Sequence, residues 1–177
     1  MTFIADAKLV YVVQGTYYVA ADPAASLSTV LGSCISVCLF DPAAAIGGMN
    51  HFLLPAGQGT EAGDLRFGVN AMEKLINAML KSGAAKSRLQ AKLFGGARMA
   101  ANLADIGDQN AAFAHSFLAN EGIPCASESL GGSLARRVIF RPATGQARVL
   151  FVRHDAVGLT EAPPPDPERR AGSVVMF

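Results

Sequence analysis

The residues with the clearest chemical potential are a cysteine and a histidine, Cys34 and His51, in two neighbouring apolar segments. These segments are residues 29–40 (TVLGSCISVCLF) and 45–55 (AIGGMNHFLLP), and the sequence DPAA between them is typical of a type I turn. An imidazole can take the proton of a neighbouring thiol, and the resulting thiolate is a strong nucleophile. The pair is therefore a candidate for covalent acyl transfer.

The two segments predict a β-hairpin that brings these side chains together. A turn centred between Pro42 and Ala43 places Cys34 opposite His51, and directly opposed residues share a face with Cβ atoms about 4.5–5.5 Å apart. Asn50 falls on the other face and does not fit its apolar pattern. The remaining residues of that face form a continuous apolar surface for a core: Ile35, Val37, Leu39, Ile46, Phe52 and Leu54.

Several groups near the pair could complete such a site. Many sites of this kind have a third group that orients the imidazole, and the nearby candidates are the hydroxyls of Ser28, Thr29 and Ser33. Main-chain N–H groups of the glycine-containing segments 32–34 and 47–48 are candidates for binding an oxyanion. A metal site is disfavoured, because Cys34 and Cys38 in one strand would lie about 13 Å apart.

The patterns around this hairpin predict an α/β domain with a mixed, largely antiparallel sheet covered by two helices. Apolar residues at three- and four-residue spacing predict a helix from Asp64 to about Ser82, ended by Gly83, and a second one from about Gln109 to Asn120. The other predicted strands cover residues 8–20 with a break at Gly15, 89–94, 125–128, 135–141 and 148–154.

The length of 177 residues suits one domain, which we expect to span residues 1–157. Residues 158–172 (GLTEAPPPDPERRAG) are rich in proline and charge. We therefore expect residues 158–177 to form a disordered C-terminal tail.

Composition and charge exclude several classes of function. With 15 Lys+Arg against 14 Asp+Glu and no basic cluster, the chain is not expected to bind nucleic acid. The sequence has no run of about 18 apolar residues and no basic start followed by an apolar run, so we expect no membrane insertion and no export. Three cysteines suit a reducing compartment better than a disulfide framework, which favours the cytoplasm.

The two segments and those that follow resemble the chemoreceptor glutamine deamidases, the CheD family of bacterial chemotaxis. The resemblance is carried by LGSCISVCLFDP (31–42) and GGMNHFLLP (47–55) and covers most of residues 8–154 in unbroken order. It continues through RFGVNAMEKLINAMLKSGA (66–84), AKLFGGARM (91–99), IGDQN (106–110), LANEGIP (118–124) and LGGSLARRVIF (130–140).

The resemblance implies which residues are catalytic. The cysteine of the family falls on Cys34 and its histidine on His51, the two residues that the hairpin brings together. Its third member is a threonine six positions before the cysteine, which is Ser28 here, while Thr29 lies one position further on.

The resemblance also implies a reaction, a fold and partners. The reaction is hydrolysis of glutamine side chains on methyl-accepting chemotaxis receptors to glutamate and ammonia through a Cys34 thioester, with no metal or organic cofactor. Related members also hydrolyse receptor glutamate methyl esters. The fold is an α/β/α three-layer sandwich, and some members bind a CheC-type phosphatase.

Two alternatives remain open from the residues. Another Cys-His acyl transferase, such as a peptidase or transglutaminase-like enzyme, would keep Cys34 and His51 but would cleave or cross-link a different protein. A non-catalytic chemotaxis regulator would keep the fold and bind receptors or a CheC-type phosphatase, and its effect would not depend on the thiol.

Overall fold

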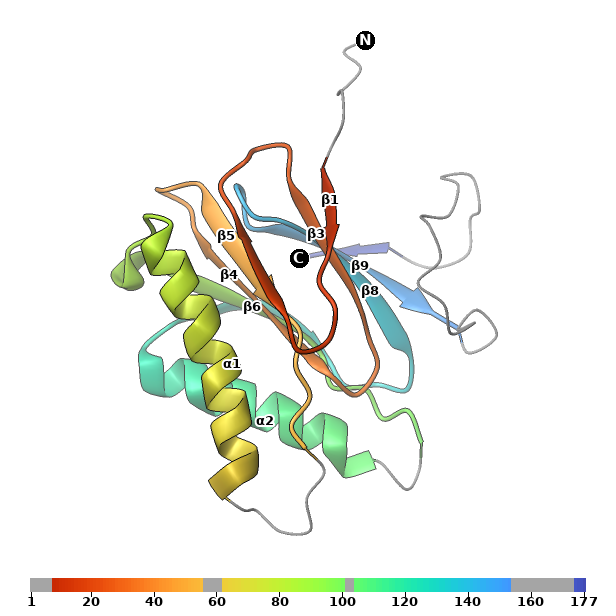
Figure 1. The fold of residues 1–177 in the computed structure, drawn as a ribbon. Coiled ribbons are helices and arrows are strands. Elements are labelled where there is room, and N and C mark those ends of the chain that lie inside the picture. The colour runs from red at the N-terminus through yellow and green to blue at the C-terminus, as the bar shows by residue number, and fades with distance from the viewer. Residues whose placement is uncertain (1–7, 56–61, 101–103, 154–173) are drawn as a thin grey trace.

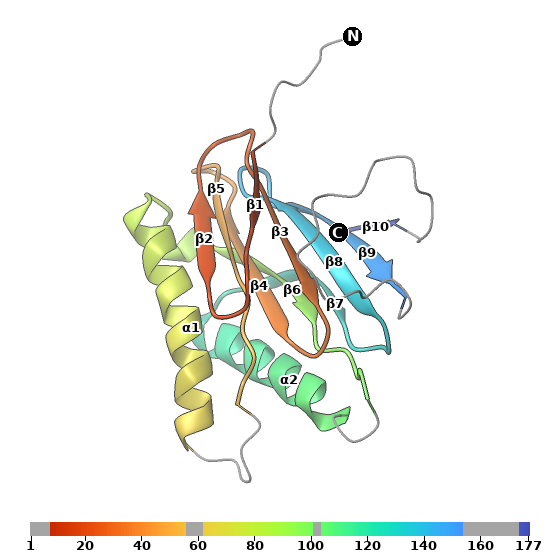
Figure 2. The same ribbon diagram turned by 45° about the vertical axis from the view of Figure 1, so that its right-hand side comes forward.

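The computed structural model describes residues 8–55, 62–100, 104–153 and 174–177, which form two five-stranded sheets and two long helices. One sheet is covered by both helices, and we call it the helix-covered sheet; the other packs on its opposite face, and we call it the outer sheet (Figure 1, Figure 2). The layers are therefore helices, sheet and sheet.

Both sheets are mixed. The helix-covered sheet is antiparallel except for its last pair, and its strands in spatial order are β2 (Tyr17–Ala20), β5 (Ile46–Asn50), β4 (Ile35–Asp41), β6 (Gln90–Gly95) and β7 (Cys125–Leu130). The outer sheet is antiparallel except for its first pair, and its strands are β1 (Leu9–Tyr11), β3 (Ser26–Leu31), β8 (Ala135–Arg141), β9 (Gln146–Val152) and β10 (Val174–Met176).

The expected α/β class with mixed, largely antiparallel pairing is confirmed, but the layers differ from the α/β/α sandwich that the resemblance implied. A second sheet lies where a second helical layer was expected. Strand β4 shows the reason, because all seven of its residues are buried. Ile35, Val37 and Leu39 belong to the core under the helices, whereas Cys38 and Phe40 belong to the core between the sheets.

The chain crosses from the outer sheet to the helix-covered sheet twice, and the sequence predicted neither crossing. Residues 29–40 were expected to form one strand, but the chain leaves β3 at Leu31 and enters β4 at Ile35. Strands β1 and β2 likewise belong to different sheets, joined around Gly15. Both crossings occur at a short glycine-containing segment, where the backbone can change direction.

Helix α1 (Ala62–Lys81) confirms the predicted helix, with Met72, Leu75 and Met79 fully buried against the helix-covered sheet. Helix α2 (Ala104–Glu121) begins five residues before the predicted start. Its first part contains Gly107, where a Cβ atom would lie 2.5 Å from the Gly96 carbonyl oxygen. A glycine inside a helix weakens the sequence pattern, yet here it permits close packing. Neither helix has a stretch long and apolar enough to cross a membrane, among the described residues.

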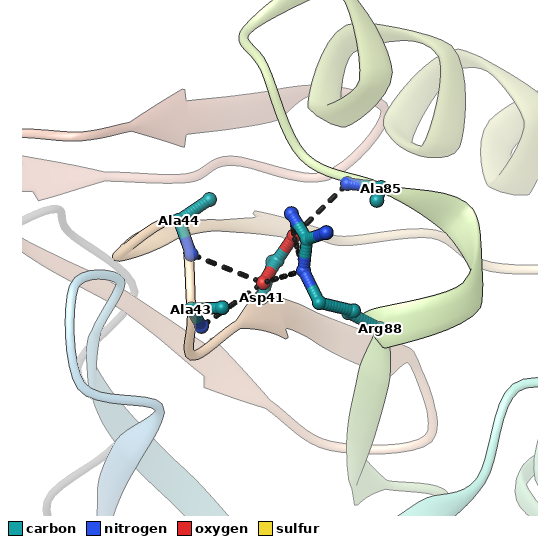
Figure 3. Close-up of polar contacts among 5 residues, drawn as sticks. All are labelled: Asp41, Ala43, Ala44, Ala85 and Arg88. Carbon is teal, nitrogen blue, oxygen red and sulfur yellow. Dashed lines mark hydrogen bonds and ion pairs between the residues drawn. The ribbon is translucent and has the colours of Figure 1, made fainter.

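The turn between β4 and β5 is longer than predicted. Asp41 pairs with Ile46, so the loop has four residues, Pro42 to Ala45, and Ala45 has a φ of +54°. The buried Asp41 carboxylate accepts hydrogen bonds from the Ala43 and Ala44 N–H groups at 3.0 and 3.1 Å, which holds this longer turn (Figure 3). The hairpin register is therefore shifted by two residues from the predicted one.

The same carboxylate joins the hairpin to the segment after α1. It accepts a hydrogen bond from Ala85 N–H at 2.9 Å and forms an ion pair at 2.9 Å with Arg88, at the end of the short 3-10 helix η1 (Lys86–Arg88) (Figure 3). The Arg88 side chain and these N–H groups hold the pKa of Asp41 well below its ordinary value, against the opposing effect of burial.

The end of the chain differs from the expected disordered tail. Strand β10 pairs antiparallel with β9, and Phe177 packs edge-on against Phe94 with ring centroids 5.9 Å apart. Residues 154–173, which contain the proline-rich sequence, lie outside the described residues. The apolar residues after that sequence thus complete the edge of the outer sheet.

Candidate active site

Cys34 lies in the second crossing, at the end of the core between the two sheets. The crossing is held through its main-chain carbonyl groups, which accept hydrogen bonds of 2.8–2.9 Å. The pairs are Gly32 with Ala97 N–H, Ser33 with the Asn110 side-chain amide, and Cys34 with Gly96 N–H. The thiol is half-buried and packs against the core between the sheets.

His51 follows the last residue of β5 and is held by the first crossing. Its carbonyl oxygen accepts a hydrogen bond from Gly15 N–H at 2.7 Å, and its N–H donates to the Thr16 carbonyl oxygen at 3.1 Å. The side chain is 93% buried, since its relative exposure is 7%. These contacts fix the imidazole at the point where both crossings meet.

The observed register replaces the predicted direct opposition of Cys34 and His51. Cys38 pairs with Met49 and an isolated bridge joins Ile35 to Phe52, so Cys34 and His51 are diagonal neighbours. Because the register shift is two residues, both side chains keep the face that was predicted. Diagonal neighbours lie about 7–8 Å apart, within reach of a long side chain such as histidine.

Thr29 of β3 orients the imidazole. Its Oγ1 lies 2.7 Å from His51 Nδ1 and donates a hydrogen bond of 2.7 Å to the Val12 carbonyl oxygen. A hydroxyl has one hydrogen, so Thr29 must accept a hydrogen bond from Nδ1–H. The tautomer is thereby fixed: Nε2 carries a lone pair, and this atom is buried with no hydrogen-bond partner among the described residues.

Ser28, which the resemblance places as the third catalytic residue, does not contact the imidazole. Alternate residues of a strand face opposite sides, and Leu27, Thr29 and Leu31 share the side that faces the helix-covered sheet. Ser28 is buried on the other side. The geometry thus favours Thr29 over Ser28 as the third residue. Alternation along one unbroken strand would have placed Ser28 on the face of Cys34, so the sequence could not identify Thr29 without the crossing.

Burial disfavours the charged forms of both the thiol and the imidazole. Burial raises the pKa of the Cys34 thiol, an effect that a hydrogen bond from its own main-chain N–H opposes. Burial also lowers the pKa of His51, opposed by the nearby Val12 carbonyl oxygen. A neutral histidine with a free Nε2 can act as a general base, and the thiol proton moves only when the reaction requires it.

Two asparagines support this geometry, and the sequence did not reveal their roles. Asn110 is fully buried, accepts a hydrogen bond from Leu54 N–H at 2.9 Å and donates to Ser33. Asn50, which did not fit the apolar face, accepts a hydrogen bond of 2.9 Å from Val37 N–H. The Asn50 side chain thus satisfies the Val37 N–H at a point where the main-chain pairing of β4 with β5 is interrupted. This hydrogen bond explains why a polar residue lies in the core.

Gln14 is a polar side chain in contact with the nucleophile. It comes from the first crossing, and its Oε1 lies 3.6 Å from Cys34 Sγ. A separate cavity of about 60 Å³ lies on the α1 side of His51, where Tyr17, Phe67 and Asn70 contribute to its lining. Cys34 is not among the residues that line this cavity.

The chain is similar to several named protein sequences. A family model described as CheD chemotactic sensory transduction matches residues 53–150. A protein of Caulobacter vibrioides named as a probable chemoreceptor glutamine deamidase CheD is 50% identical over 173 residues, which cover 95% of this chain and 92% of that protein. A protein of the same name from Rhizobium rhizogenes is 52% identical, with coverages of 84% and 82%.

One further relative is similar over nearly its whole length, whereas a solved structure is only weakly similar. A Ruegeria protein whose name also reads probable chemoreceptor glutamine deamidase is 48% identical, with 97% of each chain covered. A solved structure from Neisseria meningitidis has a TM-score of 0.43 and 16% identity over 71% of this chain and 62% of its own, a likeness too low to carry an argument. Sequence identity over nearly the whole length decides the matter: the chain belongs to the CheD family.

Proposed function

We propose that this protein hydrolyses glutamine side chains of chemoreceptors to glutamate and ammonia, with Cys34 as nucleophile and His51 as general base. The family and the names of its relatives support the reaction. The single structural observation that carries the proposal is the Thr29–His51 hydrogen bond, which leaves the Nε2 lone pair free, on a histidine whose side chain shares a face with Cys34 by the hairpin register.

In the first half of the reaction, Cys34 Sγ attacks the side-chain carbonyl carbon as the thiol proton passes to His51 Nε2. The C–N bond then breaks, and the proton on Nε2 goes to the leaving nitrogen, which departs as ammonia. In the second half, His51 takes a proton from water, whose oxygen attacks the thioester carbon. The S–C bond breaks, the proton on Nε2 returns to the Cys34 sulfur, and the free thiol and the product carboxylic acid, which ionises to glutamate, are formed.

A thiol and an imidazole that favour their neutral forms before substrate binds limit side reactions of Cys34 with other molecules. A permanently ionised thiolate reacts with many electrophiles, whereas burial keeps the Cys34 thiol protonated until an amide lies against it. Thr29 keeps Nδ1 protonated throughout, so every proton transfer uses Nε2. Thr29 therefore acts as a positioning residue, in the role of the third member of the triad.

The direct test is mass spectrometry of a chemoreceptor cytoplasmic fragment after incubation with the protein. We expect a mass increase of about 1 Da at specific glutamines with the wild-type protein and none with Cys34→Ala. Cys125→Ala is the matched control, because this exposed thiol lies on β7, away from the site, and its loss should leave the conversion unchanged. Conversion by Cys34→Ala would contradict the mechanism, and receptor binding without conversion would favour the non-catalytic regulator.

Three finer aspects of the proposal concern ester substrates, a partner and the location. The same thioester chemistry would release methanol from a methylated receptor glutamate, which the same assay detects on a methylated fragment.

We further propose a CheC-type phosphatase as a partner, to be tested by co-purification of the two proteins. Cytoplasmic location and a single domain, which includes strand β10 near the end of the chain instead of stopping at residue 157, complete the proposal.

A further inference from the structure

We infer that Gln14 is a further catalytic residue, whose side-chain amide joins the Cys34 N–H in binding the oxyanion formed when Cys34 attacks a carbonyl carbon. The inference rests on the proposed reaction at Cys34. It starts from the contact of the Gln14 carboxamide with the nucleophile, at 3.6 Å between Oε1 and Sγ.

Gln14 is held in place by the turn that carries it. This turn runs from Val13 to Thr16, with a hydrogen bond of 3.1 Å between Thr16 N–H and the Val13 carbonyl oxygen, and Gly15 takes a φ of +84°. The next two residues, Gly15 and Thr16, make the main-chain hydrogen bonds to His51 described above. The turn therefore positions the Gln14 backbone relative to the general base, while the side chain extends to the nucleophile from an exposed position.

The second donor is the N–H of Cys34 itself. In a planar trans peptide the N–H points away from the preceding carbonyl oxygen. The Ser33 carbonyl oxygen is directed at Asn110, so the Cys34 N–H points away from that residue. The hydrogen bonds at Gly32, Ser33 and Cys34 fix this orientation before substrate arrives, as an oxyanion site requires.

The chemistry of the carboxamide suits the change of charge during the reaction. At rest, the neutral thiol donates to Oε1. Once the proton has moved to His51 and negative charge develops, an oxygen facing the site is unfavourable, whereas the NH₂ group offers two donors. Rotation about the Cγ–Cδ bond of this exposed side chain turns the NH₂ group toward the oxyanion. As the C–N bond breaks, the carbonyl re-forms and the charge disappears.

The test separates stabilisation of the oxyanion from activation of the thiol. Gln14→Met keeps the length of the side chain but removes both donors, and Gln14→Glu keeps its shape but replaces the donors with a carboxylate. For each variant we would measure kcat and KM for receptor deamidation and, separately, the rate of Cys34 alkylation by iodoacetamide. Alkylation forms no oxyanion, so it reports the thiol and His51 alone.

For Gln14→Met we expect kcat to fall by about 10²–10³-fold, the usual cost of one oxyanion donor, with KM and the alkylation rate changed less than about 3-fold. Gln14→Glu should lose at least as much kcat. Gln146→Met on β9 is the matched control, since this glutamine is also exposed and lies in the outer sheet, and it should retain full activity.

Two results would overturn the inference while leaving the proposed function intact. An unchanged or raised kcat in Gln14→Met would mean that the side chain only occupies the place of the substrate amide. A fall in alkylation rate as large as the fall in kcat would mean that Gln14 acts on thiol ionisation instead. A wild-type protein that alkylates normally but converts no receptor glutamine would contradict the proposed function, and the inference with it.

Discussion

Two adjacent hydroxyls, on Ser28 and Thr29, lie on opposite sides of the same strand, so only one of them can serve the imidazole. Thr29→Val removes the group that holds the His51 tautomer, whereas Thr29→Ser keeps the hydroxyl. General base catalysis contributes about 10²–10⁴-fold, so we expect Thr29→Val to lower kcat by about 10- to 100-fold and Thr29→Ser to retain most activity. Ser28→Ala should leave kcat near the wild-type value, and a larger loss there than in Thr29→Val would contradict the geometry.

The buried imidazole of His51 links stability to pH. Because its pKa is lowered in the folded state, the unfolded chain binds more protons between that lowered value and about 6.5. Stability contributed by the neutral ring is therefore present above pH 6.5 and is lost as the pH falls toward the folded-state pKa. Urea unfolding at pH 7.5 and 5.5 should show a larger loss for the wild type than for His51→Asn. Equal losses in the two proteins would show that His51 is not the group responsible.

At the scale of elements, the end of β6 determines where Cys34 can lie. Gly95 has a φ of +112°, and a Cβ atom there would lie against the Cys34 carbonyl oxygen. We expect Gly95→Ala to lower the free energy of unfolding by about 3 kcal/mol or more and to abolish activity. Gly122→Ala is the control: its φ is +68° with no atom within 4 Å of the added Cβ, so it should cost only about 1 kcal/mol in chemical denaturation.

The elements also show how far the sequence predicts this protein and where prediction stops. Local periodicity predicts α1 well, and it identifies the two faces of β4, because each depends on residues close in sequence. The crossing at residues 32–34 was missed because both flanking strands are buried, so TVLGSCISVCLF shows one apolar run although two sheets share it. Gln14 was missed because its importance depends on a contact across 20 residues.

The predicted register of the β4–β5 hairpin was wrong by two residues. The turn chemistry of Asp41 was recognised, but its carboxylate holds two further residues in the loop, which the local pattern alone did not reveal. The predicted direct opposition of Cys34 and His51 was wrong, but the two side chains still share a face because a shift of two residues preserves it. A shift of one residue would have placed the thiol among the helices.

At the scale of the whole molecule, the end of the chain contributes to the outer sheet. Phe177 exchanges main-chain hydrogen bonds of 3.1 and 3.3 Å with Ala147 and packs on Phe94, which lies in the core between the sheets. We expect Phe177→Ala to lower the free energy of unfolding by about 2 kcal/mol, less than for a fully buried phenylalanine. Met176→Ala, at a side chain that is 60% exposed, should stay within about 0.5 kcal/mol of the wild type by the same measurement.

The two crossings between the sheets have a consequence for the newly made chain. Cys34 and His51 flank one hairpin of the helix-covered sheet, but Thr29, which orients the imidazole, comes from the outer sheet, so neither sheet alone contains the complete site. While the sheets are apart, His51 lacks the hydroxyl that holds its tautomer. The site is therefore complete only when the two sheets pack on each other, and a copy in which they are apart lacks the oriented imidazole.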